Sequence, residues 1–175
     1  KKKFVIMILV TGGCGYIGSH TVLSFLEKGF FVYVIDSHFK SNPKVIQKLK
    51  KIILNKDKNL INNLVFFKGD LRIKDDVEKV FIYAKEKKYK IEAVVHLAGL
   101  KAVQESVKNP LLYWDFNLIG TINLLKVMND YYCRSLIFSS SATIYEKSEN
   151  LIKEDFPIKP INPYGKTKSN IESLL

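Results

Sequence analysis

A tyrosine and a lysine one helical turn apart are the residues of this chain best suited to acid–base chemistry. Tyr164 and Lys168 follow Asn162 and Pro163, a good N-cap and a good first helical residue. The i to i+4 spacing predicts that both side chains lie on one helix face. Because a neighbouring ammonium and the positive end of the helix dipole favour a phenolate, Tyr164 is predicted to act as a general base. Taken alone the pair is a weak motif, and an exposed Tyr/Lys pair is the alternative.

A glycine-rich stretch near the N-terminus could hold a pyrophosphate. Gly12, Gly15 and Gly18 follow an apolar run and open a helical pattern, and Gly13 supplies a second register of the same motif. Glycines permit a tight turn and let backbone N–H groups and the helix N-terminus approach phosphate oxygens. A purely structural turn is the alternative, but the position between a strand and a helix favours dinucleotide binding.

An acid and a serine cluster follow two other apolar runs. Asp36 comes 18 residues after Gly18. A carboxylate there accepts hydrogen bonds from an adenosine ribose and repels a 2′-phosphate, so it predicts NAD rather than NADP. Ser139, Ser140 and Ser141 follow a later run and compete for the role of one catalytic hydroxyl.

The elements that must position these residues alternate along the chain. Short apolar runs cover residues 4–10, 31–35, 64–67, 93–97 and 135–138. Amphipathic helical patterns cover residues 18–28, 45–54, 74–88, a long stretch within 110–131, and a last one from Pro163. This alternation predicts βαβ units, hence an α/β fold with a doubly wound parallel sheet of the Rossmann type. Ligands of such sheets bind beyond the carboxyl ends of the strands, where the candidate residues lie.

Composition excludes several classes of protein. The 175 residues are 47% hydrophobic and 26% charged, which is typical of one globular domain. Two cysteines without a CxxC or zinc-type spacing indicate a reducing compartment, and no metal site is predicted. Because no apolar run reaches the roughly 18 residues of a membrane span and no signal-peptide pattern is present, we expect a cytoplasmic protein without a membrane partner.

The net charge of +11 invites a nucleic-acid interpretation, which the arginine content contradicts. Only Arg72 and Arg134 carry the guanidinium that recognises guanine and phosphate best. The lysines are scattered, most densely over residues 40–58. We interpret them as a solvated surface and predict no nucleic-acid partner.

The order of these motifs resembles that of the extended short-chain dehydrogenase/reductases, and within them the UDP-glucose/UDP-galactose 4-epimerases. Four segments carry the resemblance: residues 11–21, 96–103, 139–145 and 162–168, with 98–103 the most specific part. It implies tightly bound NAD, a UDP-sugar substrate, and hydride removal and return at sugar C4 through a 4-keto intermediate. The alternatives are another NAD-dependent sugar-nucleotide enzyme, of the 4,6-dehydratase or decarboxylase type, and a non-catalytic dinucleotide-sensing module.

The resemblance also implies roles for individual residues. The residues implied to contact the cofactor are Gly12, Gly15, Tyr16, Ile17, Gly18, Asp36, Ser37, Asp70, Leu71, Leu97, Ala98, Gly99, Lys101, Asn117, Tyr164 and Lys168. Ser141 would hydrogen-bond the sugar 4-hydroxyl, Tyr164 would be the base, and Lys168 would bind the nicotinamide ribose. Lys101, Ser141 and Tyr164 would contact the substrate. The chain departs from the family where asparagine is common, at Ser37, Lys40 and Phe116, and where an aromatic residue is frequent, at Leu97.

The ends of the sequence suggest a part of a longer protein. It opens with three lysines and no initiator Met, and it closes within a helical pattern. We therefore expect residues 1–175 to form an NAD-binding Rossmann domain that is incomplete at its C-terminal end and lacks a substrate domain. We expect no epimerase activity from this stretch alone. The whole protein could form a homodimer.

Overall fold

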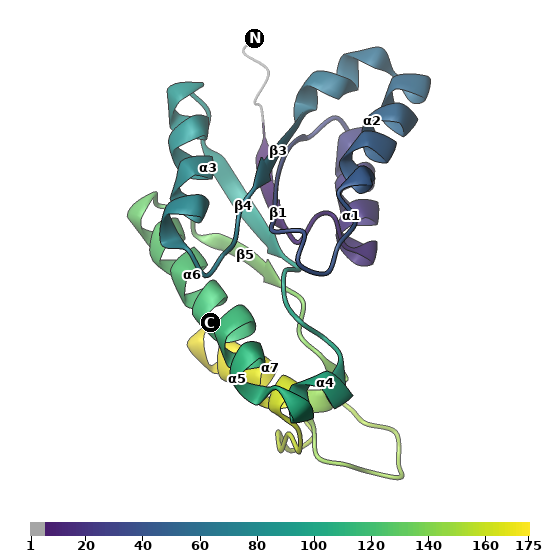
Figure 1. Cartoon of the computed structure of the whole chain (residues 1–175), viewed down its shortest axis with the longest axis vertical. Coiled ribbons are helices and arrows are strands. Elements are labelled where there is room, and N and C mark those ends of the chain that lie inside the picture. Colours follow the sequence, from purple (N-terminus) through teal and green to yellow (C-terminus); the bar gives the residue numbers. More distant parts are fainter. Residues whose placement is uncertain (1–5) are drawn as a thin grey trace.

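The computed structural model describes residues 6–175 and contains one sheet of five parallel strands (Figure 1). The strands are β1 (Met7–Thr11), β2 (Phe31–Asp36), β3 (Leu64–Lys68), β4 (Ile91–His96) and β5 (Ser135–Phe138). Their order is β3-β2-β1-β4-β5. Successive strands are added on one side of β1 up to β3 and on its other side from β4 onward, as in a doubly wound Rossmann-type sheet. The predicted fold class is therefore confirmed.

The strands begin and end within a few residues of the predicted ranges. Phe4 and Val5, the first residues of the earliest predicted run, lie outside the described residues. Strand β4 starts two residues earlier than predicted and stops at His96, because its pairing with β1 begins at Ile91 and ends where Thr11 lies opposite His96. Thr11 also lies opposite Ile35 of β2, so the carboxyl ends of the central strands are level.

Helices cover both faces of the sheet. Helices α1 (Tyr16–Glu27) and α2 (Lys44–Lys56) lie on one face, and α3 (Lys74–Glu86) and α6 (Gly120–Asp130) lie on the other (Figure 1). Each face of the sheet has its own hydrophobic core, and alternate residues of β1 belong to the two cores. Leu9 belongs to the same core as Leu124, and Val10 belongs to the same core as Leu26. A strand buried on both faces explains the continuous apolar runs of the sequence.

A third group of helices lies beyond the carboxyl end of the sheet. It contains α4 (Val103–Lys108), α5 (Pro110–Tyr113), the 3₁₀ turn η3 (Ala142–Ile144) and α7 (Pro163–Leu174). The long helix predicted within 110–131 is present, but its centre is a π-helical segment, η2 (Trp114–Ile119), between α5 and α6. Sequence periodicity missed α4, η3 and the 3₁₀ helix η1 (Lys58–Asn63), because two turns or fewer carry little periodic signal.

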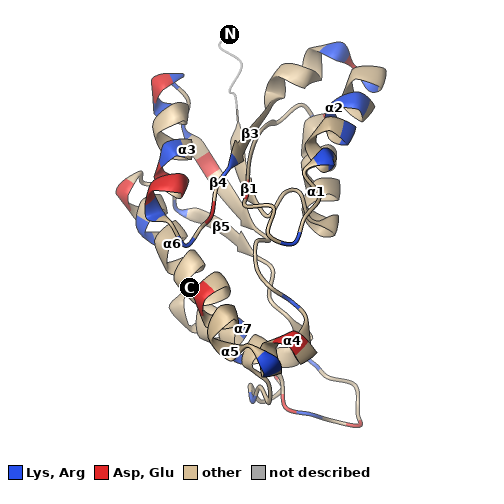
Figure 2. Cartoon of the chain, viewed as in Figure 1, with Lys and Arg blue, Asp and Glu red and all other residues tan. Residues whose placement is uncertain are grey.

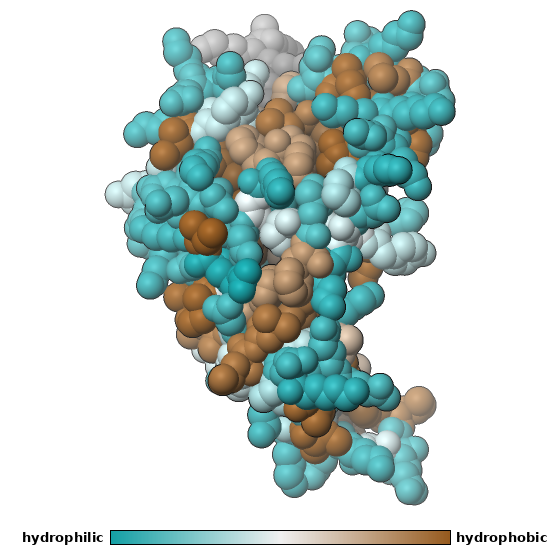
Figure 3. Space-filling view, viewed as in Figure 1, coloured by the Kyte–Doolittle hydropathy of each residue, from teal (hydrophilic) through white to brown (hydrophobic). Residues whose placement is uncertain are grey.

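The outer surface is mixed in charge. Figure 2 shows basic residues along α2 and both signs of charge on α3. On the face shown in Figure 3, apolar side chains gather between the two helical layers, and hydrophilic atoms surround them. Within residues 6–175, no helix combines the length and apolarity needed to cross a membrane.

Candidate active site

A groove of about 610 Å³ runs along the carboxyl edge of the sheet. Such a volume is typical of small-molecule sites. Residues from the segments after all five strands line it. Those that the sequence singled out are Gly12, Gly15, Tyr16, Ile17, Gly18, Asp36, Ser37, Asp70, Leu71, Leu97, Ala98, Gly99, Lys101, Tyr164 and Lys168. The sheet therefore gathers residues that lie up to 156 positions apart in the chain onto one groove.

The glycine-rich turn fits its place only because it lacks side chains. Gly12 has φ of 68°, and a Cβ there would come within 2.7 Å of the backbone nitrogen of Ala98. A Cβ at Gly18 would come within 2.2 Å of the Gly12 carbonyl oxygen. Gly15, the N-cap of α1, offers no side chain to the first N–H groups of that helix, and no acidic residue stands in its first turn. These N–H groups are thus available to an anion in the groove.

The Asp36 carboxylate is held in place by three donors. The backbone N–H of Cys14 donates to Oδ2 at 2.9 Å, the backbone N–H of His38 donates to Oδ1 at 2.9 Å, and the Ser41 hydroxyl donates to Oδ1 at 2.8 Å. Side-chain ligand atoms of Cys14, Asp36 and His38 also lie within 4.8 Å of one another. Burial and the nearby Asp36 charge raise the pKa of the Cys14 thiol to about 12, so the thiol is protonated and not prepared to bind a metal. The absence of a metal site stays a prediction.

Tyr164 and Lys168 lie together on the groove side of α7. The Asn162 side chain caps this helix by accepting a 2.8 Å hydrogen bond from the N–H of Gly165. Tyr164 is 8% exposed and Lys168 is 6% exposed, which excludes the alternative of an exposed surface pair. The Lys168 ammonium donates to the Ser139 carbonyl oxygen at 2.8 Å, and burial lowers its pKa to about 8. A phenol and an ammonium thus share one wall with the glycine-rich turn.

The chain matches, over residues 9–175, the family model described as GDP-mannose 4,6 dehydratase. It belongs to this family. Several similar proteins are epimerases. A bifunctional UDP-glucose 4-epimerase and UDP-xylose 4-epimerase of Pisum sativum is 48% identical over 168 residues, which are 95% of this chain and 46% of that protein. A UDP-glucose 4-epimerase of Arabidopsis thaliana is 46% identical, over 95% of this chain and 45% of its own length.

Solved structures agree with these relatives. The UDP-glucose 4-epimerase of Bifidobacterium longum, in complex with NAD⁺ and UDP, superposes with a TM-score of 0.84 and 38% identity, over 96% of this chain and 47% of that one. The enzyme of Stenotrophomonas maltophilia, with bound NAD and formylated UDP-arabinopyranose, superposes with a TM-score of 0.83 and 35% identity, over 97% of this chain and 47% of that one. These findings confirm the resemblance to UDP-glucose 4-epimerases. The chain spans less than half the length of the relatives it matches.

Ser141 is one of two predicted site residues of this family member that do not line the groove. Its hydroxyl lies 2.9 Å from the Thr143 hydroxyl and accepts a hydrogen bond from the Thr143 N–H, which caps η3. Ser139 and Ser140 line the groove instead, and among the described residues the buried Ser140 hydroxyl has no partner. The sequence alone does not distinguish the three hydroxyls, because each follows the same strand. The catalytic role of Ser141 stays a prediction.

Asn117 is the other residue that stands behind the wall. Its Oδ1 accepts a 2.7 Å hydrogen bond from the Leu100 N–H, and its Nδ2 donates to the Leu100 carbonyl and the Thr167 hydroxyl, both at 3.0 Å. Asn117 therefore ties the segment after β4 to α7. This geometry supports the groove from η2, and the cofactor role that the resemblance implies for Asn117 stays a prediction.

Asp70 reaches the groove beside an arginine that sequence reasoning had left without a role. Arg72 binds the Asp70 carboxylate through Nη2 at 2.7 Å and the Asp115 carboxylate through Nη1 at 2.8 Å. Burial alone would raise the pKa of Asp70, but the Arg72 guanidinium holds that pKa below its ordinary value. The Arg72 guanidinium also lies 3.6 Å from the ring centre of Phe116.

The buried His96 joins the ends of two central strands to α6. One ring nitrogen lies 2.7 Å from the Thr11 hydroxyl, and the other lies 2.8 Å from the Thr121 hydroxyl. Burial and, to a smaller degree, the Lys168 charge lower the pKa of His96 to about 3. A neutral imidazole therefore bridges two hydroxyls. No local sequence pattern predicts this network, because Thr11, His96 and Thr121 lie far apart in the sequence.

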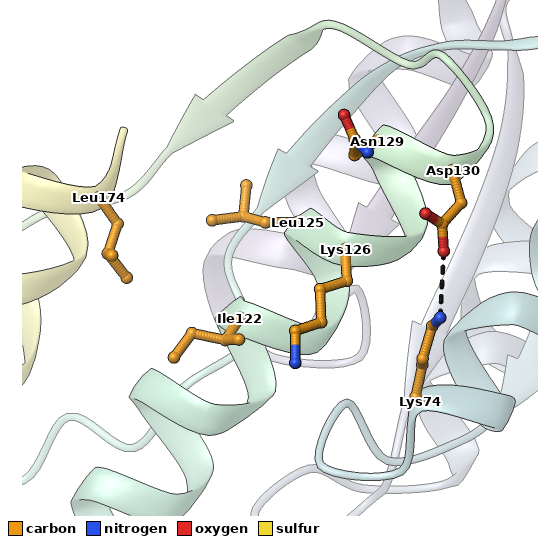
Figure 4. A pocket seen from close by; sticks show the side chains of 7 residues that line it. All are labelled: Lys74, Ile122, Leu125, Lys126, Asn129, Asp130 and Leu174. Atoms are coloured by element: carbon orange, nitrogen blue, oxygen red, sulfur yellow. Dashed lines mark hydrogen bonds and ion pairs between the residues drawn. The ribbon is translucent and has the colours of Figure 1, made fainter.

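A second hollow, of about 520 Å³, lies away from this groove between α3, α6 and the end of α7 (Figure 4). Ile122, Leu125 and Leu174 form its apolar side, and a 3.0 Å ion pair joins Lys74 to Asp130 at its edge. It holds no nucleophile and no buried titratable group, so the chemistry belongs to the groove at the sheet edge.

Proposed function

We propose that this chain is the NAD-binding part of an enzyme that interconverts UDP-glucose and UDP-galactose. One observation carries the proposal: the buried Tyr164 and Lys168 line the same groove as the glycine-rich turn and Asp36. The candidate dinucleotide-binding residues and the candidate acid–base pair therefore line one groove. The relatives at 46–48% identity are UDP-glucose 4-epimerases, which supports the same substrate class.

The groove suits NAD in shape and in charge. A side chain at Gly12 or Gly18 would collide with the chain's own backbone, so only glycines permit the tight turn that presents the N-terminus of α1 to a pyrophosphate. Asp36 would accept hydrogen bonds from the adenosine ribose, and Asp70 and Leu71 stand farther along the same edge, where the adenine would lie. The nicotinamide end would then reach Lys168. Several solved relatives contain NAD.

In the proposed reaction Tyr164 removes the proton of the sugar 4-hydroxyl as a phenolate base. NAD, when bound, supplies the acceptor and later the donor of the C4 hydride. Lys168 holds its positive charge beside the base at neutral pH, because its pKa lies near 8. Ser141 would orient the 4-hydroxyl, and Lys101 would contact the substrate. The resulting 4-keto sugar turns over and receives the hydride on its other face, and Tyr164 returns the proton.

A 4,6-dehydratase is the second candidate, since the matching family model bears that description. It would share the same first step at C4 but would release a 4-keto-6-deoxy sugar nucleotide. A non-catalytic sensor is disfavoured, because a sensor has no use for a tyrosine and lysine buried side by side at the groove.

A chimera tests the proposed function without relying on where this sequence stops. Residues 6–175 would replace the matching part of the bifunctional UDP-glucose and UDP-xylose 4-epimerase of Pisum sativum, to which the chain is 48% identical over 168 residues. We expect the chimera to convert UDP-galactose to UDP-glucose, and Tyr164→Phe to slow turnover by roughly 10²- to 10⁴-fold. Tyr132→Phe, at a residue 72% exposed, is the matched control. A folded, NAD-loaded chimera that forms only a 4-keto-6-deoxy product would establish the dehydratase instead.

We further propose that the protein works in the cytoplasm as a homodimer, with residues 1–175 as its dinucleotide-binding domain. The two free cysteines, both buried, agree with a reducing compartment. Val107 and Leu111, 62% and 81% exposed, offer apolar surface on α4 and α5 for a second subunit. Light scattering of the purified protein, with Leu111→Glu as the disrupting variant, measures the assembly.

A further inference from the structure

Two residues of the loop after β2 contact the far side of the groove. Phe39 packs its ring against Phe116 of η2, with ring centres 4.5 Å apart and planes inclined by 36°. Lys40, its neighbour, donates to the Glu105 carboxylate of α4 at 2.8 Å. All four residues line the groove. We call Phe39 and Lys40, with these two partners, the latch.

Sheet topology shows what the latch crosses. Strand β1 lies between β2 and β4 in the sheet, and it ends in the glycine-rich turn. Because Lys40 follows β2 and Glu105 follows β4, their ion pair spans the carboxyl end of β1. A dinucleotide that extends from Asp36 to Lys168 follows the same edge, so the latch crosses its path.

The partner side of the latch is rigid. Phe116 contacts both the Phe39 ring, which is tilted against it, and the Arg72 guanidinium, which lies 3.6 Å from its ring centre. Arg72 in turn is anchored by Asp70 and Asp115. Glu105 also accepts a 3.0 Å hydrogen bond from the buried Tyr113 hydroxyl. The loop after β2 thus docks on groups that are already fixed.

We propose that the latch retains the bound dinucleotide by closing over its central part. The inference rests on the proposed function, since it takes the groove to hold NAD. It also gives a role to Lys40 and Phe116, two of the positions at which the chain departs from the family. An epimerase that returns the same hydride needs a cofactor that stays bound through the whole cycle, and a latch serves that need.

The rate of NADH release from the chain tests this proposal. NADH fluorescence would be followed by rapid mixing of the loaded chain with excess NAD. We expect Phe39→Ala to speed release by roughly 3- to 10-fold, the weight of an aromatic pair. Lys40→Met should speed release by roughly 2-fold and weaken its dependence on salt, because salt screens the exposed ion pair that this substitution removes.

Two controls separate the latch from general effects of substitution. Lys56→Met breaks the ion pair between Lys56 and Glu27, which lies away from the groove. The side chains of Lys56 and Lys40 are equally exposed, at 57%. Phe39→Leu keeps apolar bulk without a ring face, should the alanine variant fail to fold. Both latch variants should melt within a few degrees of the unaltered chain, because Phe39 is 50% exposed and Lys40 is solvated.

Each outcome decides the matter. Release at the unaltered rate from both latch variants overturns the latch and leaves the proposed function standing. Equal acceleration in Lys56→Met also overturns it, because the effect would then be unspecific. If the unaltered chain binds no NADH, the proposed function fails first and the latch fails with it.

Discussion

Asp36 presents to the groove a carboxylate that two backbone N–H groups and the Ser41 hydroxyl already orient. Because a fixed negative charge repels a 2′-phosphate, we expect the chain to bind NADH far more tightly than NADPH. Asp36→Ala should weaken NADH binding by roughly 10- to 100-fold, the weight of hydrogen bonds to a charged group, and leave NADPH binding nearly unchanged. Fluorescence titration measures both, with the exposed Asp57→Ala as control. Comparable affinities in the unaltered chain would contradict the assignment of the ribose to Asp36.

The buried His96 makes stability depend on pH. Its pKa is about 3 in the folded chain and near the ordinary 6.5 in the unfolded chain, so between these values the unfolded state binds more protons. Stability is therefore lost as the pH falls from about 6.5 toward 3, by up to about 1.4 kcal/mol per pH unit. Urea unfolding at pH 7.5, 6 and 5 should show this loss in the unaltered chain and in His20→Gln. A His96→Gln chain should show a flatter dependence, and an equal slope in all three would refute the role of His96.

At the scale of the element, the π-helical segment η2 is important because it buries the side chain of Asn117. It carries Asn117, which bonds both backbone groups of Leu100 and the Thr167 hydroxyl, and thereby joins the segment after β4 to α7. π-Helical segments within α-helices are frequent at functional sites. Here the segment joins the two parts of the groove that would hold the nicotinamide end of NAD.

Replacement of Asn117 should therefore disturb a groove that it does not line. Asn117→Leu leaves the buried N–H and carbonyl of Leu100 without partners, at a cost of about 1–3 kcal/mol in the free energy of unfolding. We also expect weaker NADH binding, since Gly99, which lines the groove, lies beside both Asn117 and Lys168. Asn129→Leu, at an exposed side chain bonded only to Arg134, should change neither quantity. Unchanged NADH affinity in a destabilised Asn117→Leu chain would limit Asn117 to a structural role.

At the scale of the whole molecule, two cores share one sheet. Leu26 and Leu124 are both fully buried, on opposite faces. Each substitution to Ala should cost about 2–5 kcal/mol through lost burial and a residual cavity. Because the sites lie in separate cores, the costs should add within about 0.5 kcal/mol in the double variant. Denaturant unfolding of the four chains measures this, and strong non-additivity would mean that the sheet transmits strain between its faces.

Dinucleotide binding should stabilise this two-core molecule as one unit. NAD contacts residues after all five strands in the proposed complex, so it binds the folded state alone. At 100 times the dissociation constant it should add about 2.7 kcal/mol to the free energy of unfolding. The same increment is expected for Leu26→Ala and Leu124→Ala, because neither residue lines the groove. A smaller increment in one of them would show that its core positions the groove.

The sequence by itself determined the features that depend on neighbours in the chain. Apolar runs mark the five strands, the glycine-rich turn follows β1 because only glycine fits beside Ala98, and Asn162 with Pro163 starts α7. Backbone conformation and periodicity are local demands, so local residues report them.

The tertiary structure alone decided which side chains meet. His96 contacts a threonine 85 residues away, and Phe39 contacts Phe116 across the groove. It also placed Ser139 and Ser140, not Ser141, on the wall, and set Asn117 behind it. Strand register and helix docking set such contacts, and no spacing along the chain encodes them, because many registers are compatible with the same apolar pattern.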